Sequence, residues 1–136
     1  MEKNENRKMT DAELSAVAGG MEPAPSAIPV SGAEIFARAK KELGKPYQWG
    51  AIGPDAYDAS GLVCYCITGT HMRIGTEGTF MGWPRVSDPQ PGDICVSGSH
   101  CGIYAGPGMM IHAPTFGAVV SYGGIQGDMI IVRCPG

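Results

Sequence analysis

Apolar residues in the first part of the chain recur with the spacing of an α-helix. Ile35, Ala39 and Leu43 fall at positions i, i+4 and i+8, so they share one helical face, while charged residues occupy the opposite face. Ser31 and Glu34 stand three residues apart at the start of this segment and form a capping box. The pattern predicts an amphipathic helix that begins after Ser31 and extends to about Leu43.

A second apolar run covers residues 59–68 and comes directly after a tight turn at residues 57–61. Gly69 follows it, and glycine is the residue that most often ends a helix in the left-handed conformation. We therefore expect a second, largely apolar helix over residues 59–68. Residues 70–92 have no regular pattern beyond one short helical turn that we expect at residues 77–81.

Short apolar runs separated by Gly and Ser clusters fill the last third of the chain, which is typical of strands joined by turns. We expect strands at residues 93–96, 100–105, 109–113, 118–121 and 129–133. Helices followed by an antiparallel meander of about five strands predict an α+β fold in which the helices pack on the sheet.

Two histidines of this predicted sheet can meet. If residues 106–108 form a three-residue loop, Ala105 opposes Met109 across it. His112 then lies diagonal to His100 on one face of the sheet, on the order of 7–8 Å away, near enough for the two imidazoles to be linked. A two-residue loop would place the two rings on opposite faces.

Composition narrows the classes of function. The 136 residues suffice for one domain with a short extension, and 43% hydrophobic residues can build a core. The net charge of −3 offers no basic surface for nucleic acid. No apolar run approaches the roughly 18 residues that a membrane span requires. We expect neither a nucleic-acid partner nor a membrane-spanning helix.

The N-terminal segment resembles the double-glycine leader of bacteriocin-like peptides, which the peptidase domain of an ABC exporter reads and cuts. The matching positions are the apolar Met9, Leu14 and Val17, the acidic Glu13, and the final pair Gly19 and Gly20. The resemblance implies a leader at 1–20, cleavage after its last residue, and a secreted protein exported by a peptidase-containing ABC transporter. Residues 21–30 are then a Pro-rich linker and 31–136 the folded domain. The alternative is an amphipathic helix followed by a linker.

Five cysteines are spread over the folded domain, namely Cys64, Cys66, Cys95, Cys101 and Cys134. They lack C-x-x-C spacing and do not predict a zinc site. We expect mostly buried thiols, although in an exported protein a disulfide of Cys95 with Cys101 or Cys134 stays open. We expect no metal and no cofactor.

The turn at residues 57–61 has the setting of a reactive centre. Its first helical position, residue 59, lies where free backbone N–H groups and the positive end of the helix dipole meet. A cysteine there would have a lowered pKa and would act as a thiolate nucleophile. The sequence has Ala59 at this position. The setting is therefore present without its reactive sulfur atom.

Five segments in the correct order resemble motifs of the NlpC/P60 family of cell-wall cysteine peptidases, which have a reduced papain-like α+β domain. They are residues 43–50 (LGKPYQWG), 58–63 (DASGLV), 91–94 (PGDI), 100–104 (HCGIY) and 110–114 (MIHAP). In the family the second motif reads D-C-S-G-L-V. Each segment alone is a weak signal, whereas the ordered set is specific.

The resemblance implies a role for each matching residue. Ala59 stands at the nucleophile position, and His100 would be the general base that takes the thiol proton. His112 would orient His100 in place of the Asn or Asp of other triads. Tyr47 would lie beside the nucleophile with its hydroxyl near the substrate carbonyl.

The resemblance also implies the substrate. Family members typically cut peptidoglycan stem peptides between D-γ-glutamate and a diamino acid. Asp58 and Ser60 match positions that help to bind the free amine of a stem peptide. Peptidoglycan stem peptides are therefore the partner that we expect for the folded domain.

Ala59 cannot act as a nucleophile, so we expect the chain as written to be inactive as a hydrolase. One explanation is an engineered Cys→Ala replacement in an active enzyme; the other is a natural pseudoenzyme that only binds the wall. We favour the replacement, because a drifting pseudoenzyme would be free to lose His100 or His112 as well. A bacteriocin-like effector whose activity does not depend on this site is a third hypothesis.

Overall fold

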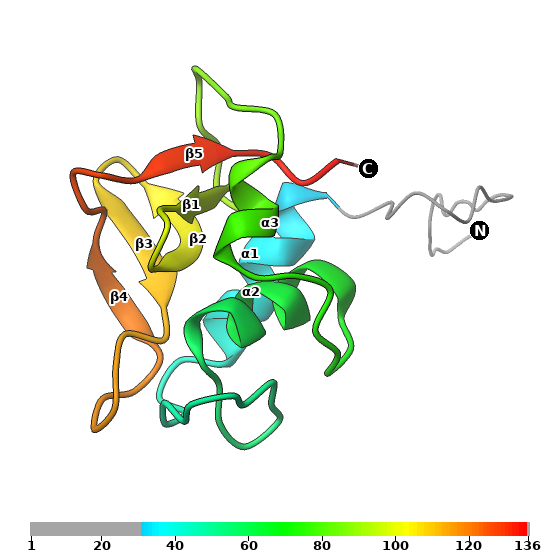
Figure 1. Ribbon diagram of the computed structural model, residues 1–136, viewed down its shortest axis with the longest axis vertical. Coiled ribbons are helices and arrows are strands. Elements are labelled where there is room, and N and C mark those ends of the chain that lie inside the picture. Colours follow the sequence, from blue (N-terminus) through cyan, green and yellow to red (C-terminus); the bar gives the residue numbers. More distant parts are fainter. Residues whose placement is uncertain (1–30, 136) are drawn as a thin grey trace, which may run out of the picture.

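The computed structural model describes residues 31–135, where three helices and five strands follow one another (Figure 1). The helices are α1 (Gly32–Lys41), α2 (Ala59–Thr68) and α3 (Glu77–Met81). The strands are β1 (Ile94–Val96), β2 (Cys101–Gly106), β3 (Met109–His112), β4 (Ser121–Gly124) and β5 (Ile130–Val132). The predicted leader and linker, residues 1–30, lie outside the described residues.

The five strands form one antiparallel sheet in the order β4-β3-β2-β1-β5. The predicted meander holds for β1 to β4 and is wrong for the last strand. β5 crosses to the far edge and pairs with β1, where Cys95 lies opposite Ile131. The predicted fold class, helices on an antiparallel sheet of five strands, is confirmed.

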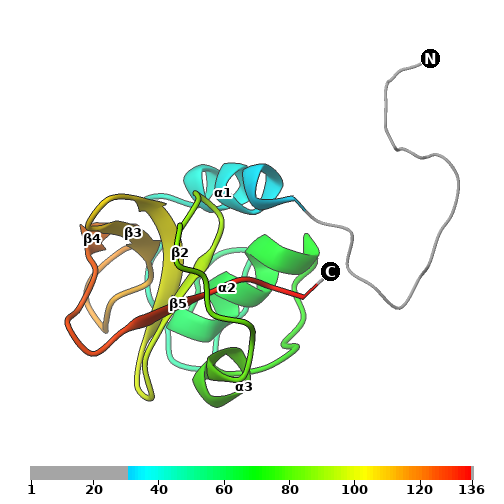
Figure 2. The same cartoon turned by 90° about the horizontal axis from the view of Figure 1, so that it is seen from above.

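The helices lie on one side of the sheet (Figure 2). The main core is the layer between them, where Leu62 and Ile67 of α2 pack with Ile103 and Ile111 of the sheet, all fully buried. A smaller cluster is formed by Cys95, Tyr104 and Met110, with Ile125, Met129 and Ile131 packed against it. These two clusters hold the strands next to the predicted histidine pair, since His112 ends β3 and His100 directly precedes β2.

The first helix begins as predicted and ends earlier. Ser31 accepts a hydrogen bond from the Glu34 amide (3.1 Å), and Glu34 Oε1 accepts one from the Ser31 amide (3.4 Å), which completes the capping box. Ile35 and Ala39 are buried. Leu43 was expected on the same stripe, but the helix ends at Lys41, so Leu43 leaves the helical face and is 37% exposed.

The second helix has the predicted bounds. Asp58 is its N-cap, and Gly69 ends it in the left-handed conformation with φ of 74°. Eight of its ten residues are buried, because the helix packs against both α1 and the sheet. Burial on all sides explains why the run is apolar throughout instead of amphipathic.

The fourth strand differs from its prediction. Residues 118–120 were expected to belong to it, whereas β4 is Ser121–Gly124. Residues 118–120 pair instead with the loop after α1: the Tyr47 amide donates to Ala118 O (3.0 Å) and the Val120 amide to Lys45 O (2.7 Å). This pairing ties the Tyr47 loop to the segment that leaves β3.

The turn between β2 and β3 is tighter than expected. Gly106 pairs with Met109 across a two-residue turn, so the predicted pairing of Ala105 with Met109 is wrong. A bulge between Tyr104 and Gly106 adds one residue to β2 and restores the register, which places Ile103 opposite Ile111. His112 therefore falls opposite Gly102, as the three-residue loop would also have placed it.

Candidate active site

A cleft of about 400 Å³ opens at the N-terminus of α2. It brings together five of the residues that the sequence singled out, namely Tyr47, Asp58, Ala59, Ser60 and His100. These residues come from the loop after α1, from the start of α2 and from the segment that enters β2. The fold therefore assembles the predicted site from three separate parts of the chain.

Asp58 fixes the start of α2. One carboxylate oxygen accepts a hydrogen bond from the Gly61 amide (2.6 Å), and the other accepts one from the Gly50 amide (3.1 Å). Gly61 has no room for a side chain, because a Cβ there would collide with the carbonyl oxygen of Ala51. The turn is thus closed around Ala59, whose side chain borders the cleft and whose backbone starts the helix.

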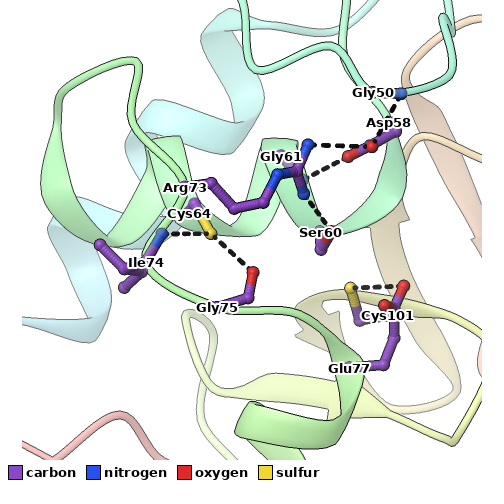
Figure 3. Close-up of polar contacts among 10 residues, drawn as sticks. All are labelled: Gly50, Asp58, Ser60, Gly61, Cys64, Arg73, Ile74, Gly75, Glu77 and Cys101. Carbon is purple, nitrogen blue, oxygen red and sulfur yellow. Dashed lines mark hydrogen bonds and ion pairs between the residues drawn. The ribbon is translucent and has the colours of Figure 1, made fainter.

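Arg73 is a site residue that the sequence analysis did not identify. Its guanidinium donates to Asp58 Oδ2 (3.0 Å) and to Ser60 Oγ (2.5 Å), as Figure 3 shows. The two side chains of the ion pair are 30% and 15% exposed, so the pair is partly shielded from water. The amine-binding role expected of Asp58 and Ser60 stays a prediction, and both side chains are already engaged by a cation of the protein.

The two histidines are in direct contact. His100 Nε2 and His112 Nδ1 are 2.7 Å apart, and the rings meet edge to face with centroids 5.0 Å apart. Gly102 makes room for this arrangement, because a Cβ at that position would lie 3.0 Å from the Cβ of His112. His112 does not line the cleft; it lies behind His100, where an orienting residue is expected.

Burial lowers the pKa of both histidines. The pKa of His112 falls to about 4, because burial and the neighbouring His100 both disfavour its charged form. Burial also lowers the pKa of His100, while the negative charge of Glu77 opposes that effect. Both rings are therefore neutral near pH 7, so one ring nitrogen of the contact donates and the other accepts.

The hydrogen bond to His112 decides which atom of His100 can do chemistry. It uses Nε2, and no partner within residues 31–135 engages Nδ1. His100 lines the cleft, and a neutral imidazole with one nitrogen held by a second residue and the other left without a partner has the arrangement of a general base. Ala59 and Tyr47 line the same cleft.

The cleft contains further residues that sequence reasoning missed, namely Trp49, Thr76, Glu77, Ser99 and Pro114. Glu77 is the first residue of α3, whose bounds were predicted correctly. The sequence could not predict these residues because residues 70–76, which place α3 beside the start of α2, have no regular pattern. A polar residue at a predicted helix start beside an irregular segment was the available hint.

Other kinds of site find less support in the part of the chain that the structure describes. Across residues 31–135 no three His, Cys, Asp or Glu side chains gather closely enough to hold a metal ion. No described helix is both long and apolar enough to cross a membrane. The five cysteines are thiols, four of them buried, and burial raises the pKa of Cys95 to about 12.

Comparison with known proteins points to one family. The family model described as the NlpC/P60 family matches residues 44–134. A probable endopeptidase p60 of Listeria grayi is 40% identical over 103 residues, which cover 69% of this chain and 20% of the relative. A probable endopeptidase of Corynebacterium glutamicum is 37% identical over 112 residues, which cover 75% of this chain and 51% of the relative. The chain thus spans between a fifth and a half of these relatives.

Solved structures agree with the fold. The NlpC/p60 domain of the peptidoglycan hydrolase SagA is 34% identical with a TM-score of 0.63, and the match covers 76% of this chain and all of that domain. The peptidoglycan hydrolase RipB of Mycobacterium tuberculosis has a TM-score of 0.70 over 92% of this chain and 78% of its own, at 20% identity. The second likeness supports the fold alone.

Proposed function

The chain belongs to the NlpC/P60 family, and we propose that its cleft binds peptidoglycan stem peptides across the bond between D-γ-glutamate and a diamino acid. Ala59 stands where the nucleophilic cysteine belongs, so the chain as written holds this substrate without cutting it. The relatives named as endopeptidases and peptidoglycan hydrolases support the substrate class.

The observation that carries the proposal is a nearly complete hydrolytic site around one alanine. The His100–His112 contact of 2.7 Å, the Asp58 cap and the cleft are all in place. A non-catalytic protein would not need two coupled neutral histidines next to the start of a helix. The arrangement is the one that a cysteine at position 59 would use.

With cysteine at position 59, His100 Nδ1 would accept the thiol proton, and the helix terminus would stabilise the thiolate. The thiolate would attack the D-glutamyl carbonyl, and the oxyanion would lie near the backbone N–H groups at the start of α2, with Tyr47 close by. His100 would then protonate the leaving amine, and water would hydrolyse the thioester. With alanine at position 59 none of these bonds forms, and only binding remains.

We propose further that the alanine replaces a cysteine in an otherwise active hydrolase. The intact histidine pair supports a replacement over long drift. The leader resemblance at residues 9–20 supports export of the domain by a peptidase-containing ABC transporter and a secreted location. Incubating the full chain with such a transporter's peptidase domain tests this part, because cleavage after Gly20 is expected and cleavage elsewhere would contradict it.

Equilibrium binding tests the central part. The full chain is titrated with a soluble stem tetrapeptide, L-Ala-γ-D-Glu-L-Lys-D-Ala, and the mixture is then analysed by mass spectrometry. Saturable binding with an intact peptide is expected. A bound peptide that is cut, or a peptide that does not bind while the chain is folded, would overturn the proposal.

The main alternative is an effector that acts without the cleft. It is distinguished by His100→Ala, which alters the cleft wall and leaves the exposed surface elsewhere unchanged. If the biological activity of the secreted protein is indifferent to this substitution, the effector hypothesis is favoured. A natural wall-binding pseudoenzyme is favoured instead if binding persists and Ala59→Cys restores no turnover.

A further inference from the structure

One charge in the cleft has no role in the proposed chemistry. Three charged side chains line the cleft, those of Asp58, Arg73 and Glu77. Asp58 and Arg73 form an ion pair of 3.0 Å and cancel each other. Within residues 31–135 no cation lies at ion-pair distance from Glu77. Since His100 is neutral near pH 7, the cleft carries a net charge of about −1, and that charge belongs to Glu77.

The Glu77 carboxylate accepts one weak side-chain hydrogen bond within residues 31–135. Glu77 is only partly exposed, and its carboxylate accepts from the Cys101 thiol, whose sulfur lies 3.8 Å from Oε2. A thiol is a weak donor, and burial raises the pKa of Cys101 well above its ordinary value, so it stays protonated. This contact leaves most of the hydrogen-bonding capacity of the carboxylate unused. The unused lone pairs of the carboxylate can accept charge-assisted hydrogen bonds from a ligand ammonium group.

Arg73 and Glu77 serve different parts of the cleft wall. Figure 3 shows Arg73 directed at Asp58 and Ser60, and Glu77 directed from α3 toward Cys101. Glu77 is near enough to His100 for its charge to oppose the lowering of the histidine pKa. A ligand cation drawn to Glu77 would therefore lie on the side of the cleft where His100 and Ala59 hold the reacting bond.

We propose that Glu77 binds a primary ammonium group of the ligand. The inference rests on the proposed function, because a stem peptide is what brings such a group into the cleft. Asp58 and Ser60 are already engaged by Arg73, so they offer no net charge to a second cation. Two amines of a stem peptide have the required chemistry: the α-amine of its first residue and the side-chain amine of its diamino acid.

The test is titration calorimetry on the full chain, which binds without turnover because of Ala59. The probes are L-Ala-γ-D-Glu-L-Lys-D-Ala, the same peptide acetylated at its α-amine, and the same peptide acetylated at the lysine side chain. A charge-assisted hydrogen bond predicts that one of the acetylated peptides binds about tenfold or more weakly than the free peptide. The peptide that weakens identifies which amine Glu77 takes.

Two substitutions assign that preference to Glu77. Glu77→Gln keeps the size of the side chain and removes its charge, and it should bring the free and acetylated peptides within about twofold of each other. Glu77→Asp keeps the charge on a shorter side chain and should retain part of the preference. Glu34→Gln is the matched control, because it removes the same charge from an exposed position of helix α1 and keeps an oxygen for the capping box; it should retain the full preference.

The outcomes separate the two levels of the proposal. Equal binding of all three peptides by the unmodified chain overturns the Glu77 assignment and leaves the proposed function standing. A preference that survives Glu77→Gln overturns the assignment as well. If no peptide binds the folded chain, the proposed function fails and the assignment fails with it.

Discussion

Replacing Asp58 with alanine should destabilise the chain more than the loss of an ordinary helix cap. The Asp58 carboxylate makes three contacts: with the amides of Gly61 (2.6 Å) and Gly50 (3.1 Å) and with Arg73 (3.0 Å). Its side chain is 15% exposed, so water replaces these contacts only in part. The Asp58 side chain therefore caps α2, holds the loop at Gly50 and forms an ion pair with Arg73.

The expected magnitude follows from these contacts. Loss of an N-cap costs about 1 kcal/mol. The partly shielded ion pair adds about 0.5–1 kcal/mol, and the lost hydrogen bond from the exposed Gly50 amide adds about 0.5 kcal/mol. Asp58→Ala should therefore lower the free energy of unfolding by about 2–2.5 kcal/mol in total. Asp58→Asn keeps an acceptor for the cap and should lose about 1 kcal/mol, chiefly from the ion pair.

Urea unfolding of the full chain measures these changes, and Ser31→Ala is the matched control. Ser31 caps α1 at an exposed position with one amide contact of 3.1 Å, so its replacement should cost about 1 kcal/mol or less. An Asp58→Ala variant that is no less stable than Ser31→Ala would refute the reasoning. It would mean that the contacts to Gly50 and Arg73 contribute nothing to holding the turn around Ala59.

Three further predictions concern the histidine pair and the sheet. Burial lowers the pKa of His112 to about 4, so as the pH falls below about 6.5 this histidine is protonated in the unfolded chain before it is protonated in the folded chain. Urea unfolding should therefore show that stability is lost between pH 6.5 and pH 4, and His112→Asn should flatten that slope. Gly123→Ala should cost about 1–3 kcal/mol, because its Cβ would collide with His112 Nε2, whereas Gly124→Ala meets no atom within 4 Å and should cost less in the same assay. Arg133→Ala should cost about 2–3 kcal/mol, because it leaves the Asp93 carboxylate, 3% exposed, without its two guanidinium bonds of 2.8 and 2.9 Å; an unchanged urea midpoint would contradict this.

Local signals in the sequence were enough to predict the helix bounds, except for the end of α1. Ser31 with Glu34, and Gly69 after an apolar run, set helix ends through contacts within a few residues, which is why the bounds of α2 and α3 could be predicted. The histidine pair also followed from local geometry, although by a different turn. The bulge in β2 restored the strand register after a turn one residue shorter than expected. No residue pattern in the sequence predicted this bulge.

Contacts between residues far apart in the sequence could not be predicted from local patterns. Arg73 reaches Asp58 and Ser60 across 15 and 13 residues of sequence, and its position depends on the path of an irregular segment. The return of β5 to β1 and the pairing of residues 118–120 with the Tyr47 loop are likewise decided by tertiary packing. The net charge of the cleft, and the role proposed for Glu77, can be worked out only when these contacts are known.

The most direct test of the whole account is a measurement of turnover by Ala59→Cys on purified peptidoglycan, with and without His100→Ala. Released fragments are identified by mass spectrometry, and both variants are first confirmed to be folded. The proposed function predicts stem fragments cut after D-glutamate from Ala59→Cys and none from the double variant. A folded Ala59→Cys protein that releases no fragments from walls of differing diamino acid, or one that still cuts without His100, would contradict it.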